Sequence, residues 1–179
     1  MPPRPQFSVY IATSLDGYIA RQDGGIDWLH IVEQPGEDYG YAAFWNSIDT
    51  LVMGRKTYET ALGFGDWPYA DKRCVVLSHR SASAHHGEEF FCGEPESLAE
   101  KLAAEGAHRV YVDGGEVIRQ FLAAGLVDDL TLSVVPVLLG DGIPLFRAGG
   151  PEQRLALIEG RTFPSGLVQL RYLTATKQG

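Results

Sequence analysis

The sequence predicts an α/β fold in which a mostly parallel, twisted central sheet is flanked by helices and ends in an antiparallel strand pair. Short β-branched and aromatic runs alternate with segments of helical periodicity through the first two thirds of the chain. Several of these runs end in a glycine or a hydroxyl residue that leads directly into a turn or a helix start. The final third instead holds two strand-like segments around the turn Pro164-Ser165-Gly166, with no helix between them.

The composition is that of a single globular domain. With 179 residues and 45% hydrophobic content, the chain can bury a substantial core, and we expect one domain over residues 1–179. The formal net charge of −8 disfavours binding to a nucleic-acid backbone. The N-terminal MPPRPQ lacks the apolar core of a signal peptide, and the apolar run 130–139 is too short to cross a bilayer. We therefore expect a cytoplasmic protein that binds neither nucleic acid nor membranes.

The two cysteines, Cys74 and Cys92, show no metal-binding or disulfide pattern. They form no CxxC pair, and no histidine stands at metal-ligand spacing from them. We expect no metal site and two reduced thiols in or near the core.

The first strand is predicted over residues 7–13, where β-branched and aromatic side chains follow one another. Asp16-Gly17 marks a turn, and an irregular segment then extends to about Glu37. Loops of this length in compact domains are usually functional or disordered, so we interpret this segment as an active-site loop. Trp28 and its apolar neighbours either close over a flat ligand or pin the loop to the core, and both roles stay open.

A helix is predicted from Asp38, because Tyr41, Phe44, Trp45 and Ile48 fall at i, i+3, i+4 and i+7 on one face. Asp38 then lies in the first turn, where the helix dipole favours a carboxylate whatever its function. A capping role and a role in substrate binding both remain open for this residue.

Two predicted strands end in cationic residues. Strand 51–53 ends at Gly54 and opens into a helix with Arg55, Lys56 and Thr57 in its first turn, and strand 74–78 ends in Ser78-His79-Arg80. Cations at a helix N-terminus oppose its dipole, and an anionic ligand would explain their presence. Ligands of open α/β sheets bind at the carboxyl edge of the strands, so we predict an anion site there.

The strongest phosphate signal is the stretch Arg109 to Ala124. Residues 110–112 are too few and too β-branched for a helix, Gly114-Gly115 ends the run, and helical periodicity then continues to Gly125. Glycines at a strand-to-helix turn let a phosphate approach the backbone, and the N-terminus of the helix favours an anion. We interpret this turn as a diphosphate cradle, with a purely structural turn as the alternative.

The remaining predicted elements complete the sheet. A short strand covers residues 90–92, and a helix follows at 95–105. A long β-rich segment covers 129–139, in which Pro136 implies an edge strand or a bulge, and the closing strands are predicted at 154–159 and 167–174. Since a strand as apolar as the long one needs cover, we expect a homodimer.

Five motifs in order resemble the dihydrofolate-reductase-like superfamily and, within it, the RibD C-terminal domain family of the bacterial bifunctional deaminase-reductases. They are SLDGYIA at 14–20, VMGRKTYE at 52–59, VLS at 76–78, VYVDGG at 110–115 and PVLLGDGIPLF at 136–146. The resemblance covers almost the whole chain. It implies the three-layer dihydrofolate-reductase-like fold, with NADPH bound along the carboxyl edge of the sheet.

The resemblance also implies which residues bind the cofactor. Arg55 and Thr57 match positions that hold the adenosine-side phosphates, residues 78–80 flank the 2′-phosphate, residues 114–117 hold the diphosphate, and Asp16-Gly17 lie near the nicotinamide ribose. The full predicted cofactor set is Thr13, Asp16, Gly17, Ile19, Gly54, Arg55, Lys56, Thr57, Leu77, Ser78, His79, Arg80, Gly93, Asp113, Gly114, Gly115, Glu116 and Val117.

Three features of the chain bear on the substrate. Tyr18 stands where riboflavin-pathway reductases often carry a basic residue, and the HxE…PCxxC zinc signature of the partner deaminase domain is absent. Asp38 precedes Gly54 by 54 − 38 = 16 residues, which resembles the spacing of the helix-opening carboxylate in dihydrofolate reductases.

We therefore expect an NADPH-dependent reductase that transfers hydride to a pteridine- or ribosylaminopyrimidine-like small molecule, similar to the 5-amino-6-(5-phosphoribosylamino)uracil reductases of riboflavin biosynthesis. Asp38 is the predicted catalytic residue, and Trp28, Asp38 and Phe44 are the predicted substrate contacts, with core packing as the alternative for Phe44. The alternative functions are a dihydrofolate or dihydropteridine reductase-like activity and an NADPH-binding module without turnover.

Overall fold

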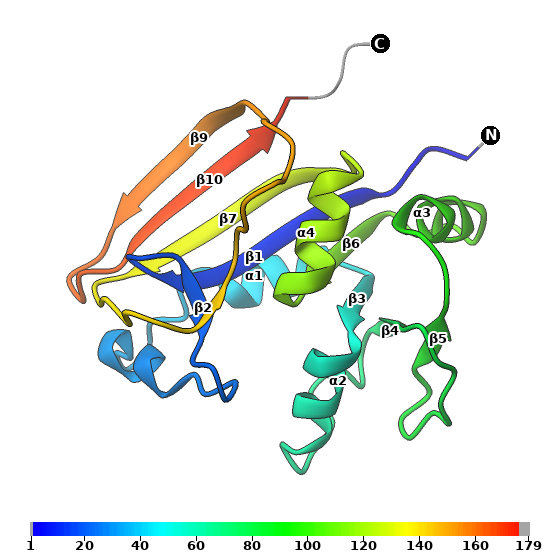
Figure 1. The fold of residues 1–179 in the computed structure, drawn as a ribbon, viewed down its shortest axis with the longest axis horizontal. Coiled ribbons are helices and arrows are strands. Elements are labelled where there is room, and N and C mark those ends of the chain that lie inside the picture. The colour runs from blue at the N-terminus through cyan, green and yellow to red at the C-terminus, as the bar shows by residue number, and fades with distance from the viewer. Residues whose placement is uncertain (1, 176–179) are drawn as a thin grey trace.

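The computed structural model describes residues 2–175. Their main feature is an eight-stranded sheet in the order β5-β4-β3-β6-β1-β7-β10-β9 (Figure 1). The strands from β5 to β7 are parallel, β10 is antiparallel to β7, and β9 is antiparallel to β10. The strand bounds are β1 Gln6–Ser14, β3 Thr50–Gly54, β4 Arg73–Leu77, β5 Glu89–Phe91, β6 Arg109–Asp113, β7 Val127–Val135, β9 Leu155–Thr162 and β10 Val168–Thr174.

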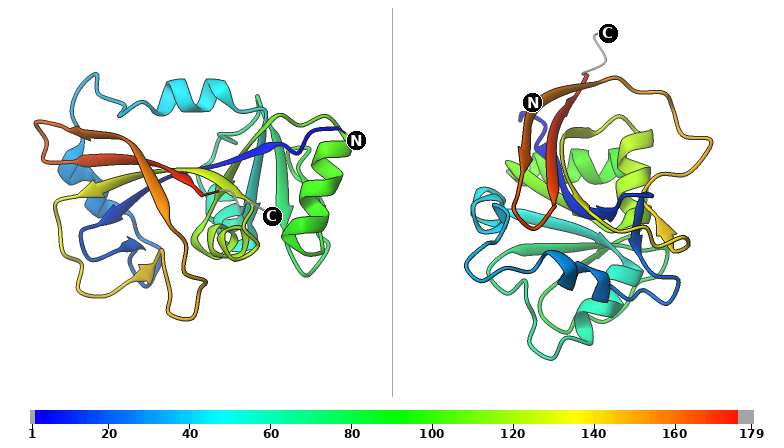
Figure 2. Two further views of the ribbon diagram at one scale, coloured as in Figure 1. Left: turned by 90° about the horizontal axis from the view of Figure 1, so that it is seen from above. Right: turned by 90° about the vertical axis from the view of Figure 1, so that its left-hand side faces the viewer.

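Helices cover both faces of the sheet and give three layers. Helices α1 (Tyr41–Ser47) and α2 (Arg55–Leu62) pack on one face, while α3 (Pro95–Ala104) and α4 (Gly115–Ala123) pack on the other. Figure 2 shows α1 on the side of the twisted sheet opposite to α3 and α4. The predicted fold class is therefore confirmed. Within residues 2–175, no helix is long and apolar enough to span a membrane.

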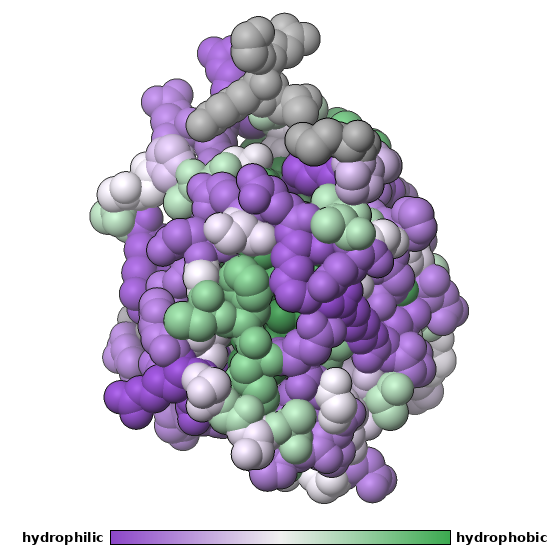
Figure 3. All heavy atoms as spheres, turned by 90° about the vertical axis from the view of Figure 1, so that its right-hand side faces the viewer, coloured by the Kyte–Doolittle hydropathy of each residue, from purple (hydrophilic) through white to green (hydrophobic). Residues whose placement is uncertain are grey.

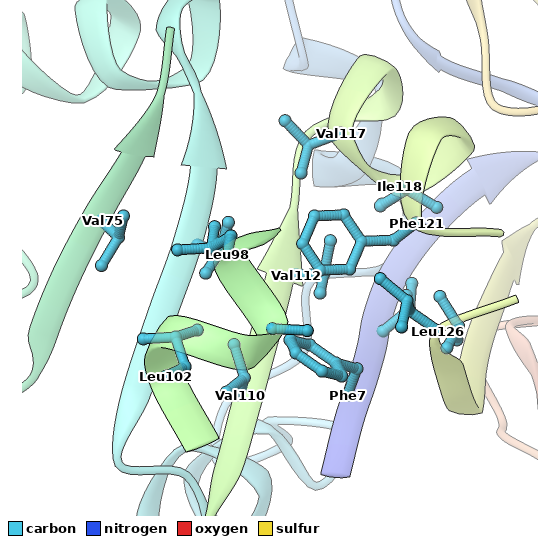
Figure 4. Close-up of a cluster of buried hydrophobic side chains, with 14 of the residues drawn as sticks. Phe7, Val75, Leu98, Leu102, Val110, Val112, Val117, Ile118, Phe121 and Leu126 are labelled. Carbon is cyan, nitrogen blue, oxygen red and sulfur yellow. The ribbon is translucent and has the colours of Figure 1, made fainter. Parts of the chain in front are cut away.

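The larger core cluster lies between the sheet and helices α3 and α4. Phe7 and Val9 of β1 point to this side and belong to one cluster with Phe121 of α4 and Leu98 of α3. The rings of Phe7 and Phe121 lie 5.2 Å apart, and Figure 4 shows both with Leu98 on this face of the sheet. Side chains of a strand alternate between the two faces, so Ser8 and Tyr10 point to the α1 side instead. The central strands β3 and β6 are buried on both faces, which explains their uninterrupted apolar runs.

The first helix begins later than the periodicity predicts. Helix α1 starts at Tyr41, and its N-cap is Gly40 with φ of 84°. Tyr39 is also left-handed, with φ of 56°, and it is the one residue other than glycine in this region of φ among residues 2–175. Two consecutive left-handed residues cannot continue a right-handed helix, so the prediction of a start at Asp38 is wrong by three residues.

The predicted loop after β1 contains regular structure. Strand β2 (Tyr18–Ala20) pairs with β8 (Ile143–Pro144) as a separate two-stranded sheet, and the 3-10 helix η1 covers Asp27–Val32. η1 packs on the sheet through a small cluster with Val135 and Leu167. Contacts with segments more than a hundred residues away in sequence therefore order this loop.

The strand pairing changes the argument for a homodimer. β7 ends at Val135, before Pro136, and both of its edges are covered, by β1 and by β10. The open edge is β9, all of whose residues are exposed, with Leu157 at 58%. At the other edge β5 is partly buried, and Figure 3 shows this side, around α3 and β5, with hydrophilic side chains surrounding a central hydrophobic group. The homodimer stays a prediction, and its candidate contact strand is β9.

Candidate active site

The carboxyl ends of β3, β4 and β6 bring the predicted anion-binding segments together. In the parallel register, Gly54 lies beside Leu77 of β4, and Met53 lies beside Asp113 of β6. Each strand then leads at once into a turn or helix that carries predicted cofactor residues, beginning at Arg55, Ser78 and Gly114. Three segments separated by more than twenty residues in sequence thus share one edge of the sheet.

Two helices point their N-termini at this edge. α2 begins at Arg55 and α4 at Gly115, and neither receives a hydrogen bond from the side chain of its N-cap residue. The first N–H groups of a helix lack partners within the helix and carry its partial positive charge, so an anion binds favourably there. Lys56 in the first turn of α2 adds a cation, and Arg55 adds another whose Nε bonds Glu59 Oε1 at 2.8 Å.

The glycine turn before α4 packs directly against α2. Gly114 has φ of 95°, and a Cβ atom on it would lie 2.5 Å from Thr57 Oγ1. A Cβ atom on Gly115 would lie 2.7 Å from Ile19 Cδ1, and one on Gly54 would lie 3.0 Å from Val117 Cγ2. Because there is no room for a side chain at Gly114, the backbone of this turn is not covered by one at the sheet edge.

The segment after β4 forms a tight turn. Ser78 Oγ donates to Arg80 O at 2.9 Å and accepts from Arg80 N at 3.2 Å, so the hydroxyl holds the turn. His79 and Arg80 are exposed, and Cys92 Sγ lies 3.8 Å from His79 O. Cys92 is itself exposed, so the expectation of a thiol in or near the core holds for buried Cys74 and is wrong for Cys92. Gly93, another of the predicted cofactor residues, directly follows Cys92 in the chain and so lies next to a residue that contacts this turn. The geometry leaves the side chains of His79 and Arg80 exposed, where they can contact a ligand.

Asp16 is engaged within the fold. Its carboxylate accepts hydrogen bonds from Ser14 Oγ at 2.6 Å, Gly140 N at 2.8 Å and Leu139 N at 3.1 Å, which hold its pKa below the usual range. Asp16 thus ties the turn after β1 to the segment after β7, and buried Thr13 lies just before this turn. Glu116 is likewise engaged, with Arg119 Nη2 at 2.8 Å.

Asp113, at the end of β6, has a pKa well above that of a free aspartate. Burial raises its pKa from 3.8 to about 6, although hydrogen bonds from Gly114 N–H, at 2.9 Å, and from Tyr111 oppose this shift. Burial also raises the pKa of Tyr41, and the nearby Asp113 carboxylate adds to that shift. Tyr111, two residues before Asp113 in β6, packs against Phe44 of α1 at a centroid distance of 4.9 Å, so this end of β6 lies close to α1 as well as to the glycine turn.

The raised pKa of Asp113 predicts a pH-dependent stability. The folded state binds more protons than the unfolded state between pH 3.8 and about 6, so this contribution to stability is complete below pH 3.8 and is lost as the pH rises through 6. Asp113→Asn should then raise the unfolding free energy at pH 7.5 by about 1 to 3 kcal/mol relative to wild type, and change it little at pH 4. Urea unfolding at both pH values measures this difference. An equal effect at both would contradict the assignment.

A cavity of about 710 Å³ opens on the α1 side of the sheet. We call it the acidic cavity, because Glu33, Glu37 and Asp38 line it and no lysine or arginine among residues 2–175 does. Its volume is in the range of small-molecule sites. The remaining lining residues are Tyr10, Ala12, Leu29, Val32, Gln34, Pro35, Tyr39, Tyr41, Ser133, Val135 and Leu167.

Asp38 lies at the wall of the acidic cavity and also caps α1. Its Oδ1 accepts from Gly40 N at 2.9 Å and its Oδ2 from Ala42 N at 3.0 Å, and these bonds hold its pKa below the usual range. The carboxylate is therefore ionised at neutral pH and acts as an acceptor. The capping role and a role at the cavity are compatible, since each oxygen keeps a second lone pair.

The backbone next to Asp38 is clamped. The carbonyl of Tyr39 accepts from Tyr10 Oη at 2.7 Å and from Gln169 Nε2 at 2.9 Å. The hydroxyl of Tyr39 contacts Val32 O and lies 2.8 Å from Ser165 Oγ. These four contacts hold Tyr39 in its left-handed conformation, and they thereby fix the position of the neighbouring Asp38 carboxylate.

The structure places the other two predicted substrate contacts in the core. Trp28 is 2% exposed, packs with Val32, Val135 and Leu167, and does not line the acidic cavity. Its Nε1 is buried without a hydrogen-bond partner among the described residues. Phe44 is 9% exposed and stacks on Tyr10 at a centroid distance of 5.0 Å, and it lines not the acidic cavity but a second, smaller one of about 280 Å³. Both positions favour the core-packing alternatives.

The sequence analysis missed Tyr10 and Gln169, which position the segment of Asp38. The sequence did contain a signal for them. Successive side chains of a strand point to opposite faces of the sheet, so Tyr10 in β1 and Gln169 in β10 point away from the faces on which their direct neighbours lie. Among residues 2–175, no group of three histidine, cysteine or acidic side chains is placed to hold a metal ion.

Comparison with known proteins identifies the family. The RibD C-terminal domain matches residues 5–169. The uncharacterised protein YwjB of Bacillus subtilis (strain 168) is 37% identical over 170 residues, covering 93% of this chain and 97% of YwjB. A crystal structure from Shewanella sp. PV-4 is 36% identical, covers 94% of this chain and 98% of that chain, and superposes with a TM-score of 0.88. Dihydrofolate reductase from Enterococcus faecalis, complexed with NADP(H), shares the fold at 15% identity, with a TM-score of 0.66 and coverage of 98% of this chain and 99% of that chain. The chain therefore belongs to the RibD C-terminal domain family.

Proposed function

We propose that this protein is an NADPH-dependent reductase that transfers hydride to a pteridine- or ribosylaminopyrimidine-like heterocycle. The observation that carries the proposal is the position of the acidic cavity beside the anion-binding edge of the sheet. Tyr10 lines the cavity, and its carbonyl accepts a hydrogen bond at 3.0 Å from the hydroxyl of Tyr111, which lies two residues before Asp113 and the glycine turn. A ligand of the sheet edge and a ligand of the cavity can therefore meet.

The residues at the sheet edge fit a nicotinamide dinucleotide. The two helix N-termini without side-chain caps suit a diphosphate, and the bare backbone at Gly114 allows close approach. Arg55, Lys56 and Arg80 offer cations for further phosphate groups, and His79 offers a ring N–H donor. When bound, the cofactor supplies a hydride from C4 of its nicotinamide ring. Family membership and a fold shared with a reductase that binds NADP(H) also support this assignment.

Asp38 has the properties of a substrate-orienting group. It is ionised, fixed by two backbone N–H groups, and exposed to the cavity. An ionised carboxylate accepts strong hydrogen bonds from the N–H groups of a heterocycle, and this fixes the substrate for hydride transfer. With its lowered pKa, Asp38 is a poor proton donor at neutral pH, so we assign it the orientation of the substrate and not the supply of the proton.

A preference for NADPH over NADH tests the cofactor assignment. We expect a difference of about 1.5 to 3 kcal/mol, or about 10- to 100-fold in the dissociation constant, since hydrogen bonds to charged groups contribute this much. Arg80→Gln should remove most of the preference, while Arg154→Gln, an exposed arginine away from the sheet edge described above, should leave it unchanged. Calorimetric titration of both cofactors measures the effect. Equal affinities of the wild type for NADPH and NADH would exclude a 2′-phosphate site.

Turnover is tested by following NADPH absorbance with pteridines, folates and ribosylaminopyrimidines. Oxidation with a member of one class identifies the substrate group. Binding of NADPH without oxidation by any of them would favour a binding module over an enzyme.

A further inference from the structure

The connection between β4 and β5 is exposed except at its two ends. Residues 79–87 are all exposed, whereas Ser78 before them and Glu88 after them are buried. We call this connection, residues 78–88, the β4–β5 loop, and it carries Arg80, one of the cations proposed for the cofactor. Exposed segments with few buried contacts open readily in native-state fluctuations. The position of Arg80 therefore depends on the groups that hold the two ends of the loop.

Glu88 holds the second end of the β4–β5 loop and also joins it to α2. Its Oε1 accepts a hydrogen bond from His85 N and its Oε2 accepts one from His86 N, both at 2.7 Å. Oε1 also accepts from the hydroxyl of Tyr58, a residue of α2 whose side chain is buried. One carboxylate thus connects the loop that carries Arg80 with the helix that begins at Arg55.

The carboxylate of Glu88 is a buried charge without an ionic partner. Glu88 is 5% exposed, and among residues 2–175 no lysine, arginine or histidine side chain forms an ion pair with it. Burial raises the pKa of Glu88, but the hydrogen bonds that it accepts outweigh burial and bring the pKa down to about 2. Because hydrogen bonds to an ionised acceptor are stronger than those between neutral groups, the bond from Tyr58 is a firm link between loop and helix.

A second contact joins the same two segments. The ring of His86 stacks on the ring of Trp67, with centroids 4.8 Å apart and an interplanar angle of 8°. Trp67 follows α2 in the chain and meets the ring of Tyr58 edge-on at a centroid distance of 5.9 Å. Tyr58 itself lies three residues after Arg55, which is about one turn along α2. The β4–β5 loop is therefore held against α2 at its second end.

We infer that Tyr58 and Glu88 are positioning residues for the cofactor, because their hydrogen bond fixes Arg80 of the loop relative to the N-terminus of α2 and so sets the preference for NADPH over NADH. The inference rests on the cofactor site of the proposed function. Both side chains are buried, so they act through Arg80 and not by contact with the 2′-phosphate. NADH lacks this phosphate, and its binding should not depend on the link.

Tyr58→Phe tests the link, since it removes the hydroxyl and keeps the ring. Calorimetry on the whole chain gives the dissociation constants of NADPH and NADH for the wild type, Tyr58→Phe, Arg80→Gln and the double variant. Thr50→Val is the matched control, because Thr50 is also buried and its hydroxyl donates to the carboxylate of Asp49 at 2.7 Å. Thr50 lies at the amino end of β3, the opposite end from Gly54. Melting temperatures show whether each variant is folded.

We expect Tyr58→Phe to weaken NADPH binding by about 5- to 10-fold and to leave NADH binding unchanged. In the Arg80→Gln background, the same change should weaken NADPH binding by less than about 2-fold, because a residue that acts through Arg80 has little further effect once Arg80 is replaced. Thr50→Val should leave both dissociation constants unchanged. Glu88→Gln is the second variant: it turns an amide N–H group towards His86 N and should also lower the preference for NADPH.

An unchanged preference for NADPH in both Tyr58→Phe and Glu88→Gln would overturn the inference. Equal losses for NADPH and NADH would overturn it too, since they indicate a general loosening of the fold, and so would a loss in Tyr58→Phe that persists in full beside Arg80→Gln. Equal affinities of the wild type for the two cofactors would remove the 2′-phosphate site and the inference with it. If the preference depends on Tyr58 yet no heterocycle oxidises NADPH, the proposed reductase activity fails and the positioning role stands.

Discussion

Asp38→Asn is expected to lower turnover by roughly 10²- to 10⁴-fold while leaving NADPH affinity unchanged. The carboxylate is ionised and lines the acidic cavity, so the substitution removes a charged acceptor from the substrate and changes nothing at the sheet edge. The rate is measured with whichever heterocycle oxidises NADPH, together with the NADPH dissociation constant. Glu37→Gln is the matched control, because Glu37 lines the same cavity and also accepts a backbone N–H, from Tyr39.

The same substitution has a small structural cost that must be separated from its effect on activity. Both oxygens of Asp38 accept backbone N–H groups, and an asparagine offers only one oxygen. Loss of one hydrogen bond should lower the unfolding free energy by about 0.5 to 1.5 kcal/mol. Wild-type turnover in a variant with this lowered stability would show that Asp38 serves its helix alone.

Gly114→Ala is expected to weaken NADPH binding by about 100-fold or more. The alanine would be held at φ of 95° with its Cβ 2.5 Å from Thr57 Oγ1, so the turn must move away from the N-terminus of α2. Backbone strain of about 1 to 3 kcal/mol, together with the displaced N–H groups, accounts for the loss. Calorimetry measures the affinity, and the melting temperature shows whether the variant folds.

A double variant tests the steric part of this explanation. Thr57→Ala with Gly114→Ala removes the contacting oxygen, and the nearest remaining atom of residue 57 is then its Cβ at 3.5 Å. NADPH affinity should recover in part. The recovery is limited by the effect of Thr57→Ala alone and by the backbone strain that remains at residue 114. No recovery would mean that the conformation of Gly114, and not its contact with Thr57, decides binding. A valine at Gly115 is a less direct test, because its Cβ meets Ile19 first.

The sequence was informative where local pattern decides structure. The sheet edge was predictable because β3, β4 and β6 are apolar runs that end abruptly at Gly54, Ser78 and Gly114, and parallel strands put such ends side by side. The start of α1 was not predictable from periodicity, because Tyr41 and the residues after it keep helical spacing wherever the helix begins. The left-handed backbone at Tyr39 and Gly40 depends on contacts from Tyr10 and Gln169.

The two cavities could not be derived from the sequence, since distant segments form them. The acidic cavity combines β1, the segment after η1, β7 and Leu167. Trp28 was ambiguous for the same reason, because Val135 and Leu167, far along the chain, decide its burial. Arg109, Arg161 and Arg171, which line the smaller cavity, come together only through the order of β6, β1, β7, β10 and β9 in the sheet and the register of β9 and β10, which no local pattern specifies.

The hydrogen bond from Gln169 to the Tyr39 carbonyl joins the beginning of the chain to its end. Gln169 belongs to β10, which pairs with the exposed edge strand β9, and edge hairpins are among the first parts of a fold to open in native-state fluctuations. Each opening of this hairpin would release the carbonyl beside Asp38, while the sheet edge formed by β3, β4 and β6 stays intact. We therefore expect the acidic cavity to be less stable than the sheet edge, and hydrogen exchange at Tyr39 and Gly40 should follow that of β10 and not that of β6.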